Sequence, residues 1–479
     1  MGRSEMASLT SVPEDIVYRI CLFLDFPSLL SIRQVSRKLK GDSLNAFKRH
    51  FKSRRVLLSQ RPLRRLCNVS AFPDLMGAIV ELQLIMPHYN CVSRAVRTNP
   101  PRSQLDRQNW LITCAVSQAH FASQDMTTML TEALRRLQSL RRISLDAVAF
   151  DDVDHSGPPS HSPGLVWKNL WSQACRVHAR LLLSIVHSGV EINSLSLYQD
   201  TPMCSLPTNE IHSALDRFDS TEFDILKTCL SLLTEFSISF SSPVLLNSRT
   251  ESLAADSHLA DPKHEKGIKA VAWLLRLMPN LTSLHLHRYN ASFNYDLGDP
   301  TRCSITDLFQ PRDFPSLREL TLRGLRVTQK EMQEFLEAHE HLRYLRLERL
   351  ALTSGSWDAV FATVCQTRSL KRLRISGLWF PGKHEQDGIY NVRPMKFPAR
   401  TGDQEEQQYD FEHDNFGDMF TWTTRDIDEP ELRAGLAFDE SRTGYGVRSS
   451  RNFVFEKQTL LEYGPPWRTL DLCTKHFRY

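Results

Sequence analysis

The sequence has no long apolar run of the kind that crosses a membrane. No stretch of the 479 residues approaches the roughly 18 uninterrupted apolar residues that a spanning helix needs, so no transmembrane segment is predicted. The N-terminal segment Met1–Met6 lacks the apolar core of a signal peptide, and Met6 stands where a myristoylation signal needs Ser or Thr. We therefore expect an intracellular protein, cytoplasmic or nuclear, with no membrane partner.

Paired cysteines and catalytic motifs are missing too. The ten cysteines are scattered singly and form no C-x-x-C pair, so the sequence predicts neither a zinc site nor a disulfide framework. It contains no H-E-x-x-H pattern, no Gly-rich phosphate loop and no G-x-S-x-G elbow. His285 and His287 alternate along a predicted strand, but two histidines without a third ligand do not make a metal site. We expect no metal, no cofactor and no enzymatic activity of the chain itself.

What the sequence does contain is a repeated L-x-x-L-x-L spacing. The last two apolar positions lie two residues apart, so they point to one face of an extended strand. The copies are Ile79–Leu84, Leu140–Leu145, Ile192–Leu197, Leu233–Ile238, Leu281–Leu286, Leu317–Leu322, Leu342–Leu347 and Leu370–Ile375. One such strand cannot bury its apolar face alone, whereas stacked copies can. The spacing therefore predicts an α/β fold: an irregular leucine-rich-repeat solenoid with a parallel sheet on its concave face.

The predicted solenoid spans residues 57–380. Helical spacing between strands, as in Met126–Leu137 and Trp357–Val364, predicts return helices on the outer face. The intervals between strands vary, and stretches rich in Ser, Pro, Asp and Gly, such as 151–164 and 241–267, are predicted loop insertions.

Two columns of side chains are predicted to face outward on the concave sheet. The first column is Gln83, Ser144, Ser196, Ser237, His285, Thr321, Arg346 and Arg374. The second column is Ile85, Asp146, Tyr198, Ser239, His287, Arg323, Glu348 and Ser376. Basic side chains gather in the C-terminal half, and planar Arg donors suit carboxylates and phosphates, so an acidic or phosphorylated protein segment is the expected substrate. The candidate substrate-binding residues are Tyr198, His285, His287, Arg323, Arg346, Arg372 and Arg374. Two alternatives stay open: these are solvated strand residues, or they pair with the chain's own acidic C-terminal segment.

Residues 8–56 are predicted to form a module of about three short helices. Ser11 and Glu14 have capping-box spacing, and Ile16, Ile20 and Leu24 recur every four residues as an apolar stripe. So small a module cannot hide all its apolar residues in its own interior, which makes an intermolecular partner plausible.

These residues resemble the F-box. The segment Val12–Ile16 (VPEDI) and the later apolar positions through Leu39 are similar to the family's Leu-Pro-x-Glu-Ile, Ile, Leu, Leu-Leu, Val-Cys-Arg pattern. Val12 stands where Leu is usual and Ser36 where Cys is usual; the family's Trp is absent, with Phe47 or Phe51 as stand-ins. The resemblance implies docking onto the Skp adaptor of a cullin-RING ubiquitin ligase. The matching adaptor-facing or module-core positions are Pro13, Ile16, Ile20, Leu24, Leu29, Leu30, Val35 and Leu39.

Module and solenoid together resemble fungal-type F-box proteins with leucine-rich repeats, the substrate receptors of Skp-cullin-F-box ubiquitin ligases. The resemblance implies a non-catalytic subunit whose module binds the Skp adaptor and cullin complex while the solenoid binds the protein substrate. A leucine-rich interaction scaffold unconnected to ubiquitin is the alternative. Within such a scaffold the module would be a helical cap on the solenoid.

A basic nucleic-acid-binding protein is the second alternative. The run Arg33–Arg65 carries twelve Lys or Arg and one acid, with Phe47 and Phe51 interleaved. No helix-turn-helix, zinc-finger or RNA-binding signature accompanies this run, so nucleic acid is not the expected partner.

The repeat signal fades in residues 381–479. The tract Asp403–Glu431 carries eleven acids and one base together with several aromatic residues. It is either an insertion that docks on the solenoid, as the aromatics favour, or a disordered acidic tract, as the charge favours. The spacing of Trp467, Leu470 and Leu472 predicts a final capping strand.

Overall fold

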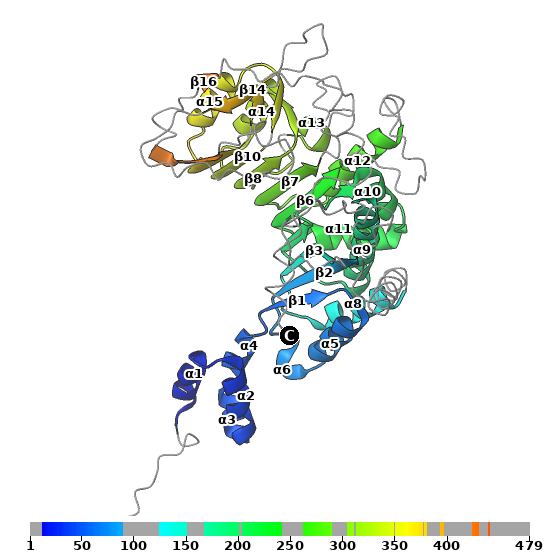
Figure 1. The fold of residues 1–479 in the computed structure, drawn as a ribbon, viewed down its shortest axis with the longest axis vertical. Coiled ribbons are helices and arrows are strands. Elements are labelled where there is room, and N and C mark those ends of the chain that lie inside the picture. Colours follow the sequence, from blue (N-terminus) through cyan, green and yellow to red (C-terminus); the bar gives the residue numbers. More distant parts are fainter. Residues whose placement is uncertain are drawn as a thin grey trace, which may run out of the picture.

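The chain is a mixed α/β structure in which helices cover a large, mostly parallel sheet, as the sequence predicted (Figure 1). The computed structural model describes residues 12–89, 124–150, 167–199, 201, 204–241, 262–289, 304–310, 313–348, 350–376, 378–380, 393–396, 424–430 and 439–440. The strands stack into a C-shaped array, and a group of short helices stands at its N-terminal end (Figure 1).

Four short helices form this N-terminal helical group: α1 (Glu14–Leu22), α2 (Phe26–Val35), α3 (Arg37–Asp42) and α4 (Leu44–Arg49). Side chains cap two of them, because the Asp25 carboxylate accepts a hydrogen bond from Ser28 N at 3.0 Å and the Ser36 hydroxyl accepts one from Leu39 N at 3.1 Å. The predicted cap Ser11 lies outside the described residues. Helix α1 begins after Pro13, which makes no side-chain cap.

The large sheet has 11 strands among the described residues. Those that lie parallel, side by side and in chain order are β1 (Ser53–Leu57), β2 (Glu81–Tyr89), β3 (Arg142–Phe150), β4 (Ser194–Leu197), β6 (Glu235–Ser241), β7 (Ser283–Tyr289), β8 (Glu319–Arg323), β10 (Tyr344–Glu348) and β12 (Arg372–Ser376). The short β5 (Leu206–Pro207) pairs with β6, and β15 (Thr424–Asp428) pairs with β12 in the antiparallel direction. All eight predicted strand segments contribute a strand, whereas β1 and β15 were not predicted. The strand predicted at 467–472 lies outside the described residues.

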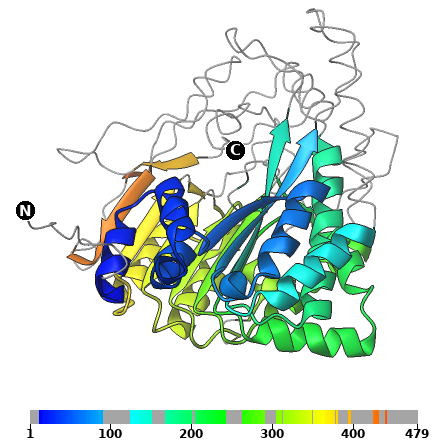
Figure 2. The same cartoon turned by 90° about the horizontal axis from the view of Figure 1, so that it is seen from below.

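Helices cover the outer face of this sheet and leave the concave face to the strands (Figures 1 and 2). They are α5 (Gln60–Ser70), α6 (Pro73–Met76), α8 (Gln124–Arg136), α9 (Trp167–Ser188), α10 (Thr208–Leu215), α11 (Ser220–Ser231), α12 (Pro262–Arg276), α13 (Ile305–Leu308), α14 (Gln329–Ala338) and α15 (Trp357–Gln366). The predicted return helices are present as α8 and α15, while α12 begins inside the segment 241–267 that was predicted as a loop.

A smaller sheet extends the C-terminal end. Its order is β16 (Asp439–Glu440), β14 (Arg393–Lys396), β13 (Trp379–Phe380), β11 (Ala351–Ser354) and β9 (Arg326–Thr328). Three of these strands, β9, β11 and β13, follow the large-sheet strands β8, β10 and β12 after a short turn, so each unit there contributes to both sheets.

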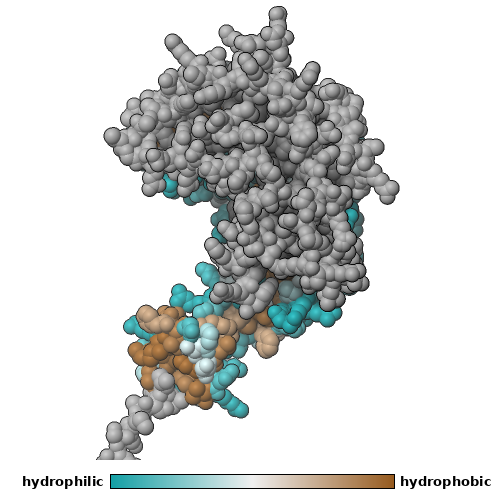
Figure 3. Space-filling view, viewed as in Figure 1, coloured by the Kyte–Doolittle hydropathy of each residue, from teal (hydrophilic) through white to brown (hydrophobic). Residues whose placement is uncertain are grey.

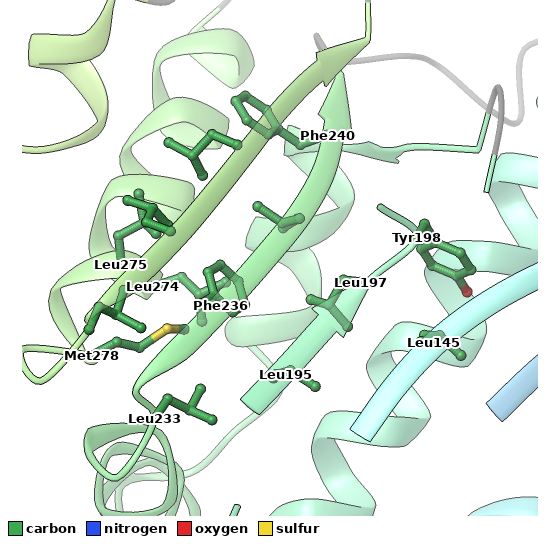
Figure 4. Close-up of a cluster of buried hydrophobic side chains, with 14 of the residues drawn as sticks. Leu145, Leu195, Leu197, Tyr198, Leu233, Phe236, Phe240, Leu274, Leu275 and Met278 are labelled. Carbon is green, nitrogen blue, oxygen red and sulfur yellow. The ribbon is translucent and has the colours of Figure 1, made fainter. Parts of the chain in front are cut away.

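The core is built from alternate residues of the large sheet packed against the helices. One row across the strands is at most 2% exposed: Leu82, Ile143, Leu195, Phe236, Leu284, Leu320, Leu345 and Leu373. Part of this packing is drawn in Figure 4, where Phe236 lies against Leu274 and Met278 of the covering helix segment. Burying each such side chain is worth about 1.5–3 kcal/mol, so the row supplies much of the cohesion between neighbouring strands.

A cluster of rings joins the helical group to the sheet. The Phe47 ring centroid lies 5.7 Å from that of Phe26 and 5.0 Å from that of Phe51, and Phe26 lies 5.9 Å from Phe51. The Arg33 guanidinium lies 4.1 Å above the Phe47 ring, and that of Arg54 lies 4.7 Å above Phe51. Phe47 packs against the core of the helical group and against the core of the sheet, so the two parts are held through it.

Candidate protein-interaction surfaces

Helix α1 carries two adjacent apolar rows, one buried and one exposed. Val17 and Cys21 are 2% and 1% exposed and lie in the core of the helical group. Ile16 and Ile20, one residue earlier in each case, are 40% and 39% exposed. Ile16 and Ile20 of the predicted stripe therefore form the outer, exposed row. Val17 and Cys21 form the inner row and complete the core of the helical group.

The remaining adaptor-facing candidates divide in the same way. Leu29 and Leu39, at 0% and 1% exposure, are core residues of the helical group and offer no surface. Leu24 is half-buried and packs against that core, whereas Pro13 is exposed. Leu30 and Val35 are exposed.

Two exposed apolar residues of the helical group escaped the sequence analysis, namely Leu22 and Phe23. Phe23 is 90% exposed at the C-terminal end of α1, outside the four-residue spacing that picked out the stripe. We define the apolar surface of the helical group as Ile16, Ile20, Leu22, Phe23, Leu30 and Val35. Figure 3 shows hydrophobic, brown surface over the helical group. Exposed apolar side chains on so small a unit make this surface a candidate interaction site.

On the concave face the strand register brings the predicted columns together. Every consecutive pair in the first column, from Gln83 with Ser144 to Arg346 with Arg374, is a pair of Cα partners on neighbouring strands. The second column is likewise in register from Ser239 through Ser376. The strand register therefore sets the basic candidates beside one another on neighbouring strands.

Tyr198 is the exception among the candidate substrate-binding residues, and its prediction as an outward-facing contact is wrong. Its side chain is 0% exposed, and its hydroxyl donates a hydrogen bond to Ala174 O at 3.0 Å. Strand β4 ends at Leu197 and Tyr198 has φ 57°, so the strand alternation no longer holds at this residue. Figure 4 shows its ring packed among the buried side chains.

The two histidines lie half-buried within hydrogen-bonded surroundings. Gln199 Nε2 lies 2.7 Å from His285 Nδ1, and Ser283 Oγ lies 3.3 Å from His285 Nε2. This contact links the end of β4 with β7, two strands away in the sheet, because β6 lies between them. No cluster of three metal-ligating side chains occurs in the part of the chain that the structure describes.

Arg323 and Arg346 share one buried carboxylate. Glu348 Oε1 lies 2.5 Å from Arg346 Nη2 and 2.6 Å from Arg346 Nε, while Arg323 Nε lies 3.8 Å from Glu348 Oε2. The Glu348 side chain is 10% exposed, and its backbone carbonyl accepts a hydrogen bond from Gly324 N at 3.0 Å. These two arginines are thus partly neutralised within the sheet itself.

Arg372 and Arg374 lie on the last parallel strand of the large sheet, beside β15. The antiparallel register places Asp428 opposite Arg372 and Asp426 opposite Arg374. Arg372 is exposed and its guanidinium lies 6.0 Å from the Tyr344 ring centroid, while Arg374 is half-buried. Part of the acidic tract 403–431 therefore docks on the sheet, which was one of the two alternatives for that tract.

The aromatic residues of the basic run are used inside the molecule. Phe51 is 6% exposed and Phe47 stacks in the ring cluster, so neither presents a face on which a nucleic-acid base could stack. Exposed cations remain at Lys52, Arg55 and the outer side of α5.

Buried thiols offer no activated nucleophile. Burial raises the pKa of Cys21, and it raises the pKa of Cys175 and Cys204 much further, which disfavours the thiolate at neutral pH.

No known protein-family model matches this sequence, and no curated protein matches it either. Within the described residues, no helix combines the length and the apolar character that spanning a bilayer requires.

Proposed function

We propose that this chain is the substrate-recognition subunit of a Skp-cullin-F-box ubiquitin ligase. In this proposal the helical group is an F-box-like module that binds the Skp adaptor, and the sheet with its covering helices is a leucine-rich-repeat solenoid that binds the protein substrate. Catalysis comes from proximity, because the chain would hold a substrate near the ubiquitin-transferring subunits.

The observation that carries the proposal is the apolar surface of the helical group. The core of this group is complete without it, since Val17, Cys21, Leu29, Leu39 and Ala46 are all at most 2% exposed. The exposed side chains belong to the same helical group and include four of the eight positions that resemble the F-box, namely Ile16, Ile20, Leu30 and Val35. A surface that is apolar and not needed for folding suits a permanent protein partner.

The ring cluster supports the same proposal. A receptor that works by proximity has to fix the distance between its adaptor-binding and substrate-binding parts. Phe26, Phe47 and Phe51 pack the helical group directly onto the sheet, so the two parts are joined by side-chain packing as well as by the chain. The concave face opens toward the side on which the helical group stands (Figure 1).

Binding of the full chain to a purified Skp adaptor tests the proposal. The variant combines Ile20→Ala and Leu30→Ala, whose side chains are 39% and 37% exposed on the helical group. The control combines Ile225→Ala and Leu232→Ala, which are 38% and 39% exposed at α11. We expect the first pair to weaken adaptor binding by more than about ten-fold and the control pair to change it by less than about two-fold.

A chain that does not bind the adaptor, or a first pair that binds like the control, would contradict the proposal. The scaffold alternative predicts stable protein partners without any Skp adaptor among them. The nucleic-acid alternative predicts binding to random DNA that weakens steeply with salt, and this binding would depend on the exposed cations at Lys52 and Arg55.

A further inference from the structure

Strand β15 differs from every other strand of the large sheet. It is the one antiparallel member among the described residues, and it comes from the acidic tract 403–431 far along the chain from its neighbour β12. It therefore belongs to none of the strand-and-helix units that build the rest of the sheet. It fills the edge of β12 that would otherwise offer unpaired backbone groups to another strand.

As a structural cap, β15 is incomplete. In one core row Ile427 follows Leu373 and is 1% exposed, which matches the other strands. The second core row ends in a charged residue, Arg425 of β15. The apolar residues that precede it in this row are Leu84, Leu145, Leu197, Ile238, Leu286, Leu322, Leu347 and Ile375. Like the opposite end strand β1, which has Arg54 in the first row, strand β15 supplies one apolar anchor where the inner strands supply two, so less apolar burial opposes its departure.

Charge fits this edge better than apolar packing does. Directly opposite residues of an antiparallel pair share a face of the sheet, and opposite charges at such positions attract. The register sets the acidic positions 426 and 428 opposite Arg374 and Arg372, with Ile427 between them. Residues 426–428 of β15, which pair with β12, are an acid, an apolar residue and an acid in that order.

We propose that β15 is an exchangeable occupant of the β12 edge, and that this edge binds an extended acidic segment of a protein partner in its place. The proposal deepens the proposed function and rests on it, because it names the substrate class of the receptor. The partner strand has the spacing acid, apolar, acid. Its backbone pairs with β12, its apolar side chain takes the place of Ile427, and Arg372 and Arg374 select its carboxylates.

The tethered strand β15 then lowers the apparent affinity of the β12 edge for a separate partner strand. Because β15 is part of the same chain, it competes with an incoming strand at a fixed effective concentration, whatever the concentration of the protein. Weakening β15 without touching the edge should therefore tighten the binding of a separate acidic strand.

A labelled peptide with the sequence of residues 422–430 is the probe, and its binding to the full chain is followed by fluorescence anisotropy. The first chain variant combines Asp426→Lys and Asp428→Lys, which sets like charges opposite the two arginines and leaves Ile427 in place. We expect the probe to bind this variant about ten-fold more tightly than the wild-type chain, given the strength of two cross-strand charge pairs. A probe with lysine at the two acidic positions should bind neither chain.

A charge-exchange variant distinguishes a changed edge interaction from misfolding of the chain. A second chain variant combines Arg372→Glu and Arg374→Glu and keeps Asp426 and Asp428, and this variant should bind the lysine probe but not the acidic probe. Equal affinity of the acidic probe for the wild type and the first variant would overturn the proposal, as would binding to neither. If the chain with Arg372→Glu and Arg374→Glu still binds the acidic probe better than the lysine probe, the proposal is overturned too.

Capture of the Skp adaptor is measured on the same samples. If the adaptor binds and the probe does not exchange, the edge proposal fails while the proposed function stands. If the probe exchanges as expected and the adaptor does not bind, the ubiquitin-ligase function fails and the edge remains a site for acidic strands.

Discussion

Replacing Phe47 by alanine should loosen the joint between the helical group and the sheet. Phe47 packs against both cores, stacks on Phe26, contacts the Phe51 ring and lies under the Arg33 guanidinium. No other ring of the cluster makes all of these contacts. The variant therefore removes the centre of the joint and leaves each core complete.

The expected loss follows from these contacts. Truncating a fully buried Phe costs about 3–5 kcal/mol, so the half-buried Phe47 should lose roughly 2 kcal/mol through burial. Its two ring contacts add about 0.5–1.5 kcal/mol each beyond burial. We expect the free energy of unfolding to fall by about 3 kcal/mol or slightly more.

Urea unfolding followed by circular dichroism measures this loss, and limited trypsin digestion locates it. The joint contains trypsin sites at Arg49 and Lys52, both exposed, which should be cut faster in the Phe47→Ala chain. The matched control is Phe23→Ala, which removes a ring that is 90% exposed and should change stability by less than about 0.5 kcal/mol. If Phe47→Ala costs no more than Phe23→Ala, the ring cluster does not hold the two parts together.

Two further changes test the buried polar groups. Tyr198→Phe removes the hydrogen bond to Ala174 O and should cost about 1 kcal/mol of unfolding free energy without weakening any partner captured on the concave face; selective loss of the partner would restore Tyr198 as a contact. Burial lowers the pKa of His178 from 6.5 to about 4, so the unfolded chain binds the proton first as the pH falls. The stability is then complete above pH 6.5 and decreases by roughly 3 kcal/mol toward pH 4. His178→Leu should flatten this part of the pH profile of urea unfolding, and parallel profiles for the two chains would contradict the reasoning.

In the large sheet, the strands that could be predicted are those with a neighbour on each side. A strand inside the stack needs two apolar residues at alternate positions, as Leu345 and Leu347 show, and this spacing is visible in the sequence. The two outermost strands, β1 and β15, each replace one of these residues by arginine, namely Arg54 and Arg425. A terminal strand packs on one side only, so it keeps one of the two alternate apolar residues on which the prediction depended.

The orientation of the apolar residues in the helical group could not be predicted. Ile16 and Val17 are both apolar, as are Leu29 and Leu30, so the spacing allows either member of each pair to face inward. Tertiary packing decides, and it places Val17 and Leu29 in the core. A helix that is apolar on two faces indicates that a surface is used, but not which one.

The sequence shows where the arginines lie and leaves open which carboxylates neutralise them. Arg346 meets Glu348 on its own strand, and if Arg346 turned to a partner, the buried Glu348 carboxylate would keep only the 3.8 Å contact with Arg323. An acidic partner therefore gains little from Arg346. Arg372 and Arg374 lie opposite acids on a strand with a single apolar anchor, which a partner strand of the same pattern can replace without exposing a buried charge. The basic candidates on the concave face are thus unequal, and recognition of an acidic segment should depend on the pair at its C-terminal edge.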